Sequence, residues 1–382
     1  MSRPLRLLTL GHSYVVGTNR ALADAMARAG GGRWEVTVAA PDAFPGDLGP
    51  IRLAAVPGEA PRLEPVPVHG AGRIHTMRYG SRLRALLREG WDAVHCWEEP
   101  FIAAGAQVAA WTPRDARLVY ATFQNLPKRY PPPFGWMERY AMRRAAGWIA
   151  FGATVEETLR TRPLYQARPH RVISPGVDTA RFRPDAEARG RVREALGWSA
   201  DGPLVIGYLG RFVPEKGITL LLRALAGARQ PWRVLLVGGG PMEGELRAWA
   251  AGQGDRARVV TGVRHEEVPA HLNAMDLLCA PSQTTARWRE QLGRMLLEAM
   301  ACGVPVIGSD SGEVPHVLAD AGVVVAEADG AAWTREIDRL LADSGERAAM
   351  AARGLARVEA EFALPVVARR HLAFFEELVR GA

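Results

Sequence analysis

Short apolar runs occur along the first half of the chain, and amphipathic stretches separate them. The apolar runs are residues 5–10, 34–39, 92–97, 116–123 and 148–151, and helical spacing occurs at 21–29 and 81–89. Short apolar runs that alternate with helical stretches are typical of a parallel sheet with helices on both faces. We therefore predict that residues 1–173 form an α/β domain of the doubly wound, Rossmann-like type.

The same pattern restarts after a stretch rich in Pro, Gly and Asp at residues 174–185, which we interpret as a linker. Six further candidate strands, each followed by a helical stretch, lie at 204–210, 232–240, 257–262, 276–282, 303–309 and 322–327. Residues 186–364 are thus predicted to form a second Rossmann-like domain. The helical segment at 365–382 is expected to pack back on the first domain.

The length of the chain agrees with this division. A chain of 382 residues is too long for one ordinary core and suits two domains of roughly 150–200 residues. Two domains imply a cleft across which they face each other. Ligands of such sheets bind outside the carboxyl ends of the strands, so the chemistry is expected just after each strand.

The cysteines and the first residues of the chain bear on the cellular compartment of the protein. Cys96, Cys279 and Cys302 lie far apart and each within an apolar stretch, so we expect buried thiols rather than a disulfide framework or a zinc site. The first apolar run ends at Gly11 without a cleavage site, and no apolar run reaches the roughly 18 residues that a spanning helix needs. A cytoplasmic protein is expected.

The formal charge is +7, and much of the basic excess lies between Lys128 and Arg193. Such a surface suits anionic lipid, nucleic acid or phosphorylated substrates. We favour a solvated, Arg-rich surface, and keep peripheral contact with an anionic membrane as the alternative. The eleven Trp residues are scattered and form no stacking platform, so nucleic acid is not expected as a partner.

Two cations flank the turn after the strand at 204–210. The segment runs Gly210-Arg211-Phe-Val-Pro-Glu-Lys216-Gly217. A guanidinium can hold two phosphate oxygens at once, and a lysine adds a mobile point charge. Together they could hold a diphosphate without a metal ion. The alternative is an ordinary helix-start turn with a surface lysine.

The segment from Glu290 to Ile307 is the most specific in the chain. From Gly293 its residues suit a helix that ends at Gly303, so Glu290 lies just before the helix and Glu298 inside it. The helix start offers free N–H groups at Leu292, Gly293 and Arg294. Glu298 stands in an apolar run and needs a hydrogen-bond donor, which a ribose diol would supply.

These motifs together resemble the retaining GT-B glycosyltransferases of family 4 type (glycosyl transferases group 1). The resemblance rests on the Glu290-x7-Glu298 spacing, the turn from Gly210 to Gly217 and the GVPVIGSDSGEVPHV continuation, and it covers the second domain and the two-domain layout. It implies that Arg211 and Lys216 bind the diphosphate of a nucleotide-sugar donor. It also implies donor contacts from the residues Gly210, Val263, Glu290, Leu292, Gly293, Arg294 and Glu298.

The implied reaction transfers a hexose-type sugar to a hydroxyl acceptor with retention of configuration and without metal or cofactor. Arg211, Lys216 and the helix start at Gly293 would stabilise the departing diphosphate, whose own oxygen would take the acceptor's proton. The alternative makes Glu290 a covalent nucleophile. The acceptor is expected to be a sugar, a lipid-linked molecule or a small hydroxyl compound.

The first domain departs from the family pattern. Its turn from Gly11 through His12 to Gly17 is bulkier than the family's Gly-rich turn, and Gln124 stands where many members carry a His. These residues are predicted to line an acceptor site, together with His95, Asn125 and Lys128. The two histidines are equally compatible with structural roles.

Two other functions remain open at this point, namely a nucleotide-sugar epimerase and a non-catalytic scaffold that kept the fold. Other chemistry lacks support. The pair His265 and His271 does not match HExxH, and Pro269 breaks the helix that such a zinc site requires. The glycines at 238–244 miss the spacing of a dinucleotide-binding turn.

Overall fold

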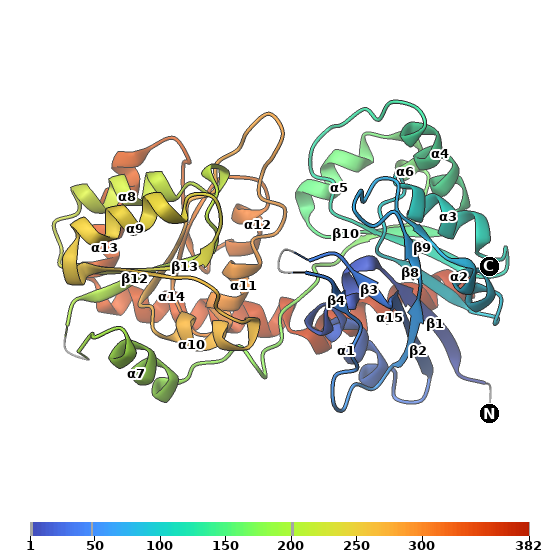
Figure 1. Ribbon diagram of the computed structural model, residues 1–382, viewed down its shortest axis with the longest axis horizontal. Coiled ribbons are helices and arrows are strands. Elements are labelled where there is room, and N and C mark those ends of the chain that lie inside the picture. Colours follow the sequence, from blue (N-terminus) through green and yellow to red (C-terminus); the bar gives the residue numbers. More distant parts are fainter. Residues whose placement is uncertain (1–2, 47–48, 200–201, 382) are drawn as a thin grey trace. The chain divides into compact units, whose positions relative to one another are not determined.

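Each of the two units into which the chain divides is built around one parallel sheet (Figure 1). The computed structural model describes residues 3–46, 49–199 and 202–381. The first unit holds the chain up to Gly176 and the segment from Leu364 onward, and the second unit is Val177–Ala363. Residues 177–185, predicted as linker, belong to the second unit because Val177 pairs with Ala363 and Phe182 is buried in its core.

The first unit contains a seven-stranded sheet of order β11-β10-β9-β8-β1-β2-β5 in which every neighbouring pair is parallel. Strand order reverses between β1 and β8, which is the doubly wound arrangement. The strands are β1 (Leu5–Leu10), β2 (Trp34–Pro41), β5 (Arg62–Val66), β8 (Ala93–Cys96), β9 (Arg117–Thr122), β10 (Gly147–Ala150) and β11 (His170–Val172). Two short hairpins add β3 (Ala43–Phe44) with β4 (Ile51–Arg52), and β6 (Val68–His69) with β7 (Arg78–Tyr79).

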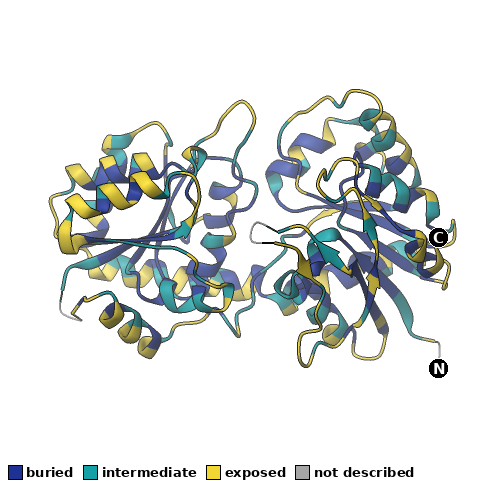
Figure 2. Ribbon diagram, in the orientation of Figure 1, coloured by how far each residue is buried: buried dark blue, intermediate teal, exposed yellow. Residues whose placement is uncertain are grey.

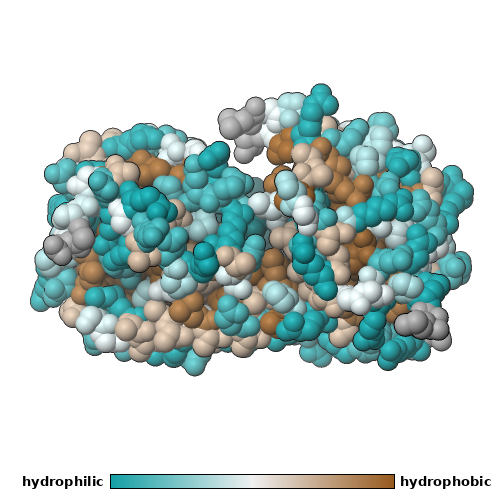
Figure 3. All heavy atoms as spheres, turned by 90° about the horizontal axis from the view of Figure 1, so that it is seen from below, coloured by the Kyte–Doolittle hydropathy of each residue, from teal (hydrophilic) through white to brown (hydrophobic). Residues whose placement is uncertain are grey.

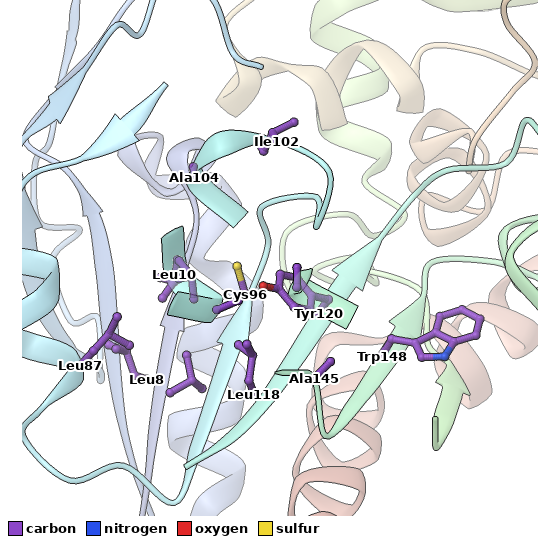
Figure 4. Packing of buried hydrophobic residues seen from close by; sticks show 14 of the residues in the cluster. Leu8, Leu10, Leu87, Cys96, Ile102, Ala104, Leu118, Tyr120, Ala145 and Trp148 are labelled. Atoms are coloured by element: carbon purple, nitrogen blue, oxygen red, sulfur yellow. The ribbon is translucent and has the colours of Figure 1, made fainter. Parts of the chain in front are cut away.

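Helices cover both faces of this sheet because successive strand residues point to opposite sides. On one face Leu7 packs with residues of α1 and α15, while on the other Leu8 and Leu10 pack with residues of α2–α5 (Figure 4). The helices are α1 (Ala21–Gly30), α2 (Ser81–Leu87), α3 (Ala103–Trp111), α4 (Phe134–Arg144), α5 (Ala153–Arg160), α6 (Pro163–Gln166) and α15 (Leu364–Arg380), with the 3₁₀ turns η1 (His12–Val15) and η2 (Gly17–Arg20).

The second unit repeats the plan with a six-stranded parallel sheet of order β14-β13-β12-β15-β16-β17. Its strands are β12 (Leu204–Arg211), β13 (Trp232–Gly239), β14 (Ala257–Val260), β15 (Leu277–Ala280), β16 (Val306–Ser309) and β17 (Val323–Val325). All of the strands that the apolar runs predict in both units are therefore present.

Helices α10, α11 and α12 cover one face of the second sheet, and α8, α9 and α13 cover the other. Figure 2 shows the strands as buried and the outward helix faces as exposed. The elements are α7 (Ala186–Ala195), η3 (Pro214–Lys216), α8 (Ile218–Gly227), α9 (Glu243–Gly252), η4 (Gly254–Arg256), η5 (His265–Glu267), α10 (Val268–Asn273), α11 (Arg294–Ala301), α12 (Val314–Leu318), α13 (Gly330–Ala342), α14 (Ser344–Arg357) and the π-helical turn η6 (Val358–Phe362).

One face of the molecule mixes polar and apolar residues. The face drawn in Figure 3 carries hydrophilic residues interspersed with apolar ones. The three cysteines are buried and unpaired, as predicted. In the described part of the chain, no helix is long and apolar enough to cross a membrane.

Two buried histidines join the C-terminal helix α15 to strand β8. The rings of His95 and His371 lie 5.4 Å apart between centroids, and both residues are fully buried. The indole N–H of Trp97 donates to Nδ1 of His95, while Nδ1 of His371 lies 2.9 Å from the carbonyl oxygen of Val367. Burial lowers the pKa of His95 well below 6.5 and that of His371 to about 4.

These depressed pKa values predict that acid destabilises the first unit. Below about pH 6.5 an unfolded imidazole binds a proton that the folded His371 refuses until about pH 4, so stability falls through this interval. One such group is worth on the order of 3 kcal/mol. Urea unfolding at pH 7 and pH 4.5 should show a smaller acid loss for His371→Leu than for the wild type. Equal losses of unfolding free energy in the wild type and His371→Leu would contradict this account. His69→Leu, at an exposed histidine, serves as the control.

Candidate active site

The carboxyl ends of β12 and β15 mark the point where strand order reverses in the second sheet. Ligands of open α/β sheets bind at such points. Three segments follow the strands at this edge: the turn 211–217 after β12, the loop 281–293 after β15 and the turn 310–313 after β16. They contain most of the predicted donor-binding residues.

The turn after β12 carries the two predicted phosphate-binding cations in different settings. The Arg211 side chain is 64% exposed, and its nearest carboxylate is Glu215 at 3.9 Å. The Lys216 side chain is only 13% exposed. The turn fits closely against the loop after β15, because a Cβ atom at Gly217 would lie 1.7 Å from the carbonyl oxygen of Pro281. Gly217 also has a φ of +70°, which glycine adopts without strain.

Glu290 and Lys216 form an ion pair in which Nζ lies 2.5 Å from Oε2. The same oxygen accepts a hydrogen bond of 2.8 Å from the Ser282 hydroxyl, and Glu290 is 6% exposed. The ring of Trp288 lies 5.0 Å from the Lys216 ammonium. Lys216 and Glu290, which the resemblance implies both contact the donor, are thus direct neighbours. Sequence reasoning missed Ser282 and Trp288, although Ser282 is the last residue of the strand predicted at 276–282.

The turn after β16 holds the backbone of Glu290. The Glu313 N–H donates to the Glu290 carbonyl oxygen at 3.0 Å, and the Glu290 N–H donates to the Ser311 hydroxyl at 3.4 Å. Gly312 makes this approach feasible, since a Cβ atom there would lie 2.0 Å from that carbonyl oxygen. Glu290 therefore has a fixed position before α11 rather than a mobile one.

Helix α11 begins as predicted. Gly293 is its N-cap, with a φ of +72° and no side-chain cap, so no capping side chain occupies the first-turn amides, which are suited to an anion. Leu292 is 8% exposed and packs in the core, which leaves its backbone as the part available to a ligand. Arg294 has a side chain that is 54% exposed.

Glu298 lies one helical turn further and is 7% exposed. Burial raises the pKa of its carboxyl, while the charges of Arg294 and Arg181 work in the opposite direction. Arg294 Nε lies 4.0 Å from Oε1, which is too far for a hydrogen bond. A carboxyl in this setting can accept hydrogen bonds from a diol.

The remaining donor-site predictions fall at the ends of neighbouring strands. Gly210 precedes the last residue of β12, and a Cβ atom at Gly238 of β13 would lie 1.8 Å from its carbonyl oxygen. Gly238 is thus needed for the close packing of β13 on β12, and Gly240 for the approach to the carbonyl oxygen of Phe212, from which a Cβ atom would lie 2.6 Å. Val263 is half-buried after β14.

The reversal point of the first sheet holds a second group of polar residues. Both carboxyl oxygens of the fully buried Glu98, which follows β8, accept hydrogen bonds: Oε1 from the backbone N–H of His12 at 2.6 Å and Oε2 from the imidazole at 2.8 Å. Tyr79 also donates to Oε1 at 2.6 Å. Gly11 packs tightly, because a Cβ atom there would lie 2.9 Å from Cβ of Trp97. Gly17 is similarly close to Val56.

Gln124 is buried and engaged at both ends of its amide. It donates to Glu99 at 2.8 Å and accepts from the Tyr130 hydroxyl at 2.6 Å. Burial raises the pKa of the Glu99 carboxyl to about 7. Asn125 is buried too, whereas Lys128 is exposed. In this structure Gln124 positions its neighbours, and Lys128 is the more accessible of the polar groups predicted there.

The prediction that His95 lines an acceptor site requires correction. His95 is fully buried on the face of β8 that packs on α15, among Trp97, His371 and Phe375. A substrate cannot reach it there. Sequence reasoning also missed Glu98 and Glu99, although two acids directly after an apolar strand are an available signal.

Comparisons with known proteins agree with this architecture. A model described as Glycosyl transferases group 1 matches residues 193–357, and one described as Glycosyltransferase Family 4 matches residues 17–181. A GDP-mannose-dependent alpha-(1-6)-phosphatidylinositol monomannoside mannosyltransferase of Mycolicibacterium smegmatis is 41% identical over 290 residues, which cover 72% of this chain and 74% of that protein. A D-inositol 3-phosphate glycosyltransferase of Salinispora tropica is 36% identical over 214 residues, covering 50% and 43%.

Solved structures show the same fold. Anabaena HepE in complex with UDP has a TM-score of 0.74 at 18% identity, covering 98% of this chain and 100% of that one. Sucrose-phosphate synthase from Thermosynechococcus elongatus has a TM-score of 0.74 at 23% identity, covering 99% and 100%. The fold and the residues at its strand ends define a glycosyltransferase of the GT-B type. The chain belongs to the glycosyl transferases group 1, of family 4 type.

Proposed function

We propose that the protein transfers a hexose-type sugar from a nucleoside diphosphate donor to a hydroxyl acceptor, with retention of configuration and without a metal ion. The observation that carries this proposal is the pair Lys216 and Glu290 at the reversal point of the second sheet, with Glu298 in the helix that follows. The Lys216 cation suits a diphosphate, while the carboxyl groups of Glu290 and Glu298 suit hydroxyls of a sugar and of a ribose. The three side chains at the carboxyl ends of the strands therefore match the three parts of a nucleotide sugar.

GDP-mannose is the donor we propose. The supporting observation is the 41% identity with a relative whose name makes it GDP-mannose-dependent. In this chain Glu298 would accept hydrogen bonds from the ribose hydroxyls, and Val263 would border the base. Arg211 and Lys216 would hold the diphosphate, and Glu290 would bind hydroxyls of the sugar.

The chain's own residues supply electrostatic catalysis in this scheme. The bond between the anomeric carbon and the phosphate oxygen breaks, the acceptor oxygen bonds to the same face of that carbon, and its proton passes to the leaving phosphate. Lys216, Arg211 and the first-turn amides of α11 stabilise the charge that develops on the diphosphate. Lys216 pairs with Glu290, so an ammonium that turned towards the diphosphate would leave the carboxylate free to bind the sugar.

The donor site and its products distinguish this proposal from the alternatives. Among the described residues no three His, Cys, Asp or Glu side chains form a metal-binding group, and the proposed donor site rests on the cations Arg211 and Lys216. An epimerase would convert the nucleotide sugar without an acceptor, and a scaffold would bind without turnover. Product analysis with and without acceptor distinguishes the three functions.

Calorimetric titration with GDP, UDP, ADP and dTDP in EDTA tests the donor site. We expect GDP to bind with micromolar affinity, and Glu298→Ala to weaken it by roughly tenfold to a hundredfold, since two charge-assisted hydrogen bonds are lost. Arg223→Ala, an exposed change on α8, serves as the control. Absence of binding by every nucleotide would overturn the metal-free donor site.

We also propose that α4 contacts an anionic membrane, which suits a lipid-linked acceptor. Trp136 and Tyr140 are 62% and 45% exposed, and they share one helix face with the exposed Arg139 and Arg143. Neither arginine has an ion-pair partner among the described residues. Aromatic rings with neighbouring cations are typical of surfaces that lie at the headgroup level of anionic bilayers.

Flotation with phospholipid vesicles tests this contact. Binding to vesicles with about a third phosphatidylserine is expected to exceed binding to pure phosphatidylcholine. Arg139→Glu changes the charge of α4 by two, so it should reduce this binding by roughly thirtyfold, at about 1 kcal/mol for each unit of charge near the surface. Arg223→Glu on α8 is the matched control. Equal loss in both variants would indicate a non-specific charge effect and contradict the assignment to α4.

A further inference from the structure

We propose that His12 is an acceptor-binding residue and that Glu98 orients its imidazole so that Nε2 receives a hydrogen bond from the acceptor hydroxyl. This inference rests on the proposed transfer to a hydroxyl acceptor, and it assigns a side chain of the first unit to that acceptor.

The hydrogen bonds of His12 fix its tautomer. Nδ1 lies 2.8 Å from Oε2 of Glu98, and a carboxylate only accepts, so Nδ1 carries the hydrogen. In the neutral imidazole Nε2 is then a hydrogen-bond acceptor. Among the described residues no hydrogen-bond partner lies at Nε2. The imidazole is therefore held by one nitrogen and offers the other.

Glu98 is itself held from several sides. Its Oε1 accepts hydrogen bonds of 2.6 Å from both the His12 backbone and the Tyr79 hydroxyl, and the residue is fully buried. The His12 ring also packs on Phe44 at 5.2 Å. Three donors on one buried carboxylate leave the imidazole little rotational freedom, which is the arrangement that orients a histidine for a ligand.

The position of the pair points to a ligand rather than to stability. His12 begins the turn after β1, and Glu98 follows β8, so they meet where strand order reverses in the first sheet. Burying a carboxylate costs free energy that an apolar side chain would avoid, so a fold has little reason to place one there for stability alone. The His12 side chain is 29% exposed while that of Glu98 is fully covered, so only the imidazole is open to a ligand.

The pKa of His12 bears on this role, because Nε2 accepts a hydrogen bond only in the neutral imidazole. Burial works to lower the pKa of His12, but the hydrogen bond and the charge of Glu98 outweigh it and raise the pKa above 6.5. The negative charge of Glu98 behind the ring favours a neutral hydroxyl over an anionic group as the partner of the neutral imidazole. His12 takes no proton in the transfer, since that proton passes to the leaving phosphate.

Two replacements separate ligand binding from structural support. His12→Asn keeps an N–H donor close to the position of Nδ1, so it can still bond Glu98, but it has no atom at the position of Nε2. His12→Gln places a polar atom near Nε2 and loses the bond to Glu98. Tyr79→Phe removes one donor from Glu98 and tests the positioning role without leaving a charge unpaired.

The experiment is nitrogen-15 NMR of the histidines in the full-length protein with saturating GDP, using myo-inositol and methyl α-D-mannopyranoside as hydroxyl probes. We expect the Nε2 resonance of His12 to shift when at least one probe is added. His12→Asn should reduce the affinity for that probe at least tenfold and leave the affinity for GDP unchanged. His12→Gln should recover part of the loss. Tyr79→Phe should reduce the affinity for the probe by a smaller factor than His12→Asn does.

Several results would overturn the proposal. The first is that neither probe shifts the His12 resonance. The second is that wild type and His12→Asn bind the probe equally well, and the third is that His12→Asn loses GDP affinity in parallel with probe affinity. D-inositol 3-phosphate as a third probe tests the charge argument, because binding only by this anion would make His12 a phosphate-binding cation instead. Failure of GDP itself to bind the wild type would refute the donor site separately.

Discussion

Replacing Lys216 with alanine is expected to lower kcat/KM for the donor by a factor on the order of a hundred to a thousand. The ammonium is the less exposed of the two cations in the turn after β12 and lies 2.5 Å from Glu290. Removing it withdraws stabilisation from the departing diphosphate and leaves Glu290 without its cation. Loss of one preorganised group that stabilises developing charge has effects of this size.

Steady-state kinetics with GDP-mannose measures this effect. Lys216→Arg keeps the charge but not the compact ammonium between Glu290 and Trp288, so an intermediate loss is expected. Arg223→Ala removes an equal charge from the exposed face of α8 and should leave the rate unchanged. If Lys216→Ala retained more than about a tenth of the wild-type value, the diphosphate role of Lys216 would be refuted.

Replacing Gly217 with alanine is expected to destabilise the second unit by about 3 kcal/mol or more. Its φ is +70°, and the new Cβ atom would lie 1.7 Å from the backbone carbonyl oxygen of Pro281. The turn after β12 or the loop after β15 must then move. Because Lys216 directly precedes Gly217, the same displacement should weaken donor binding.

Gly262→Ala is a matched control for backbone strain. Gly262 has a φ of +71°, and a Cβ atom there would meet nothing within 4 Å. It should cost only the conformational penalty of about 1 kcal/mol. Urea unfolding of both variants, with GDP titration of each, measures the difference. Equal destabilisation would mean that the approach to Pro281 can relax without cost and that the turn is not fixed by it.

The sequence predicted every strand of the second sheet and the central strands of the first, but not the two edge strands of the first sheet. Central parallel strands are buried on both sides and read as continuous apolar runs, such as Leu204–Leu209. The edge strand β5 contains Arg62, Glu64 and Pro65, and β11 begins with His170 and Arg171. Edge strands face water on one side and tolerate proline and charge, so these two carry no apolar signal.

The sequence allows a donor site to be proposed residue by residue, because the candidate residues lie in local motifs. Lys216 and Glu290 belong to separate motifs, and their direct contact follows only from the adjacency of β12 and β15. The polar residues of the first unit had no comparable motif. His12 and Glu98 become neighbours through the pairing of β1 with β8, and one sequence does not reveal such pairing between distant residues.

His95 is a residue whose local sequence suggested a binding role that its place in the fold does not support. It lies on an apolar strand near its carboxyl end, where a ligand-binding residue is plausible, but its side chain points to the face that α15 covers. The helix that buries it comes from the end of the chain, so periodicity within the strand could not identify its partner. A histidine within a strand is therefore poor evidence for a site unless the covering element is known.

Proton NMR of GDP-α-D-mannose incubated with the protein in EDTA tests the central claim most directly. The first-formed mannose, either free or on a hydroxyl acceptor, can be assigned to the α or β configuration before free mannose equilibrates. The account predicts turnover without added metal and an α-configured product. A β-configured product, or turnover that appears only when a divalent metal ion is restored, would contradict it.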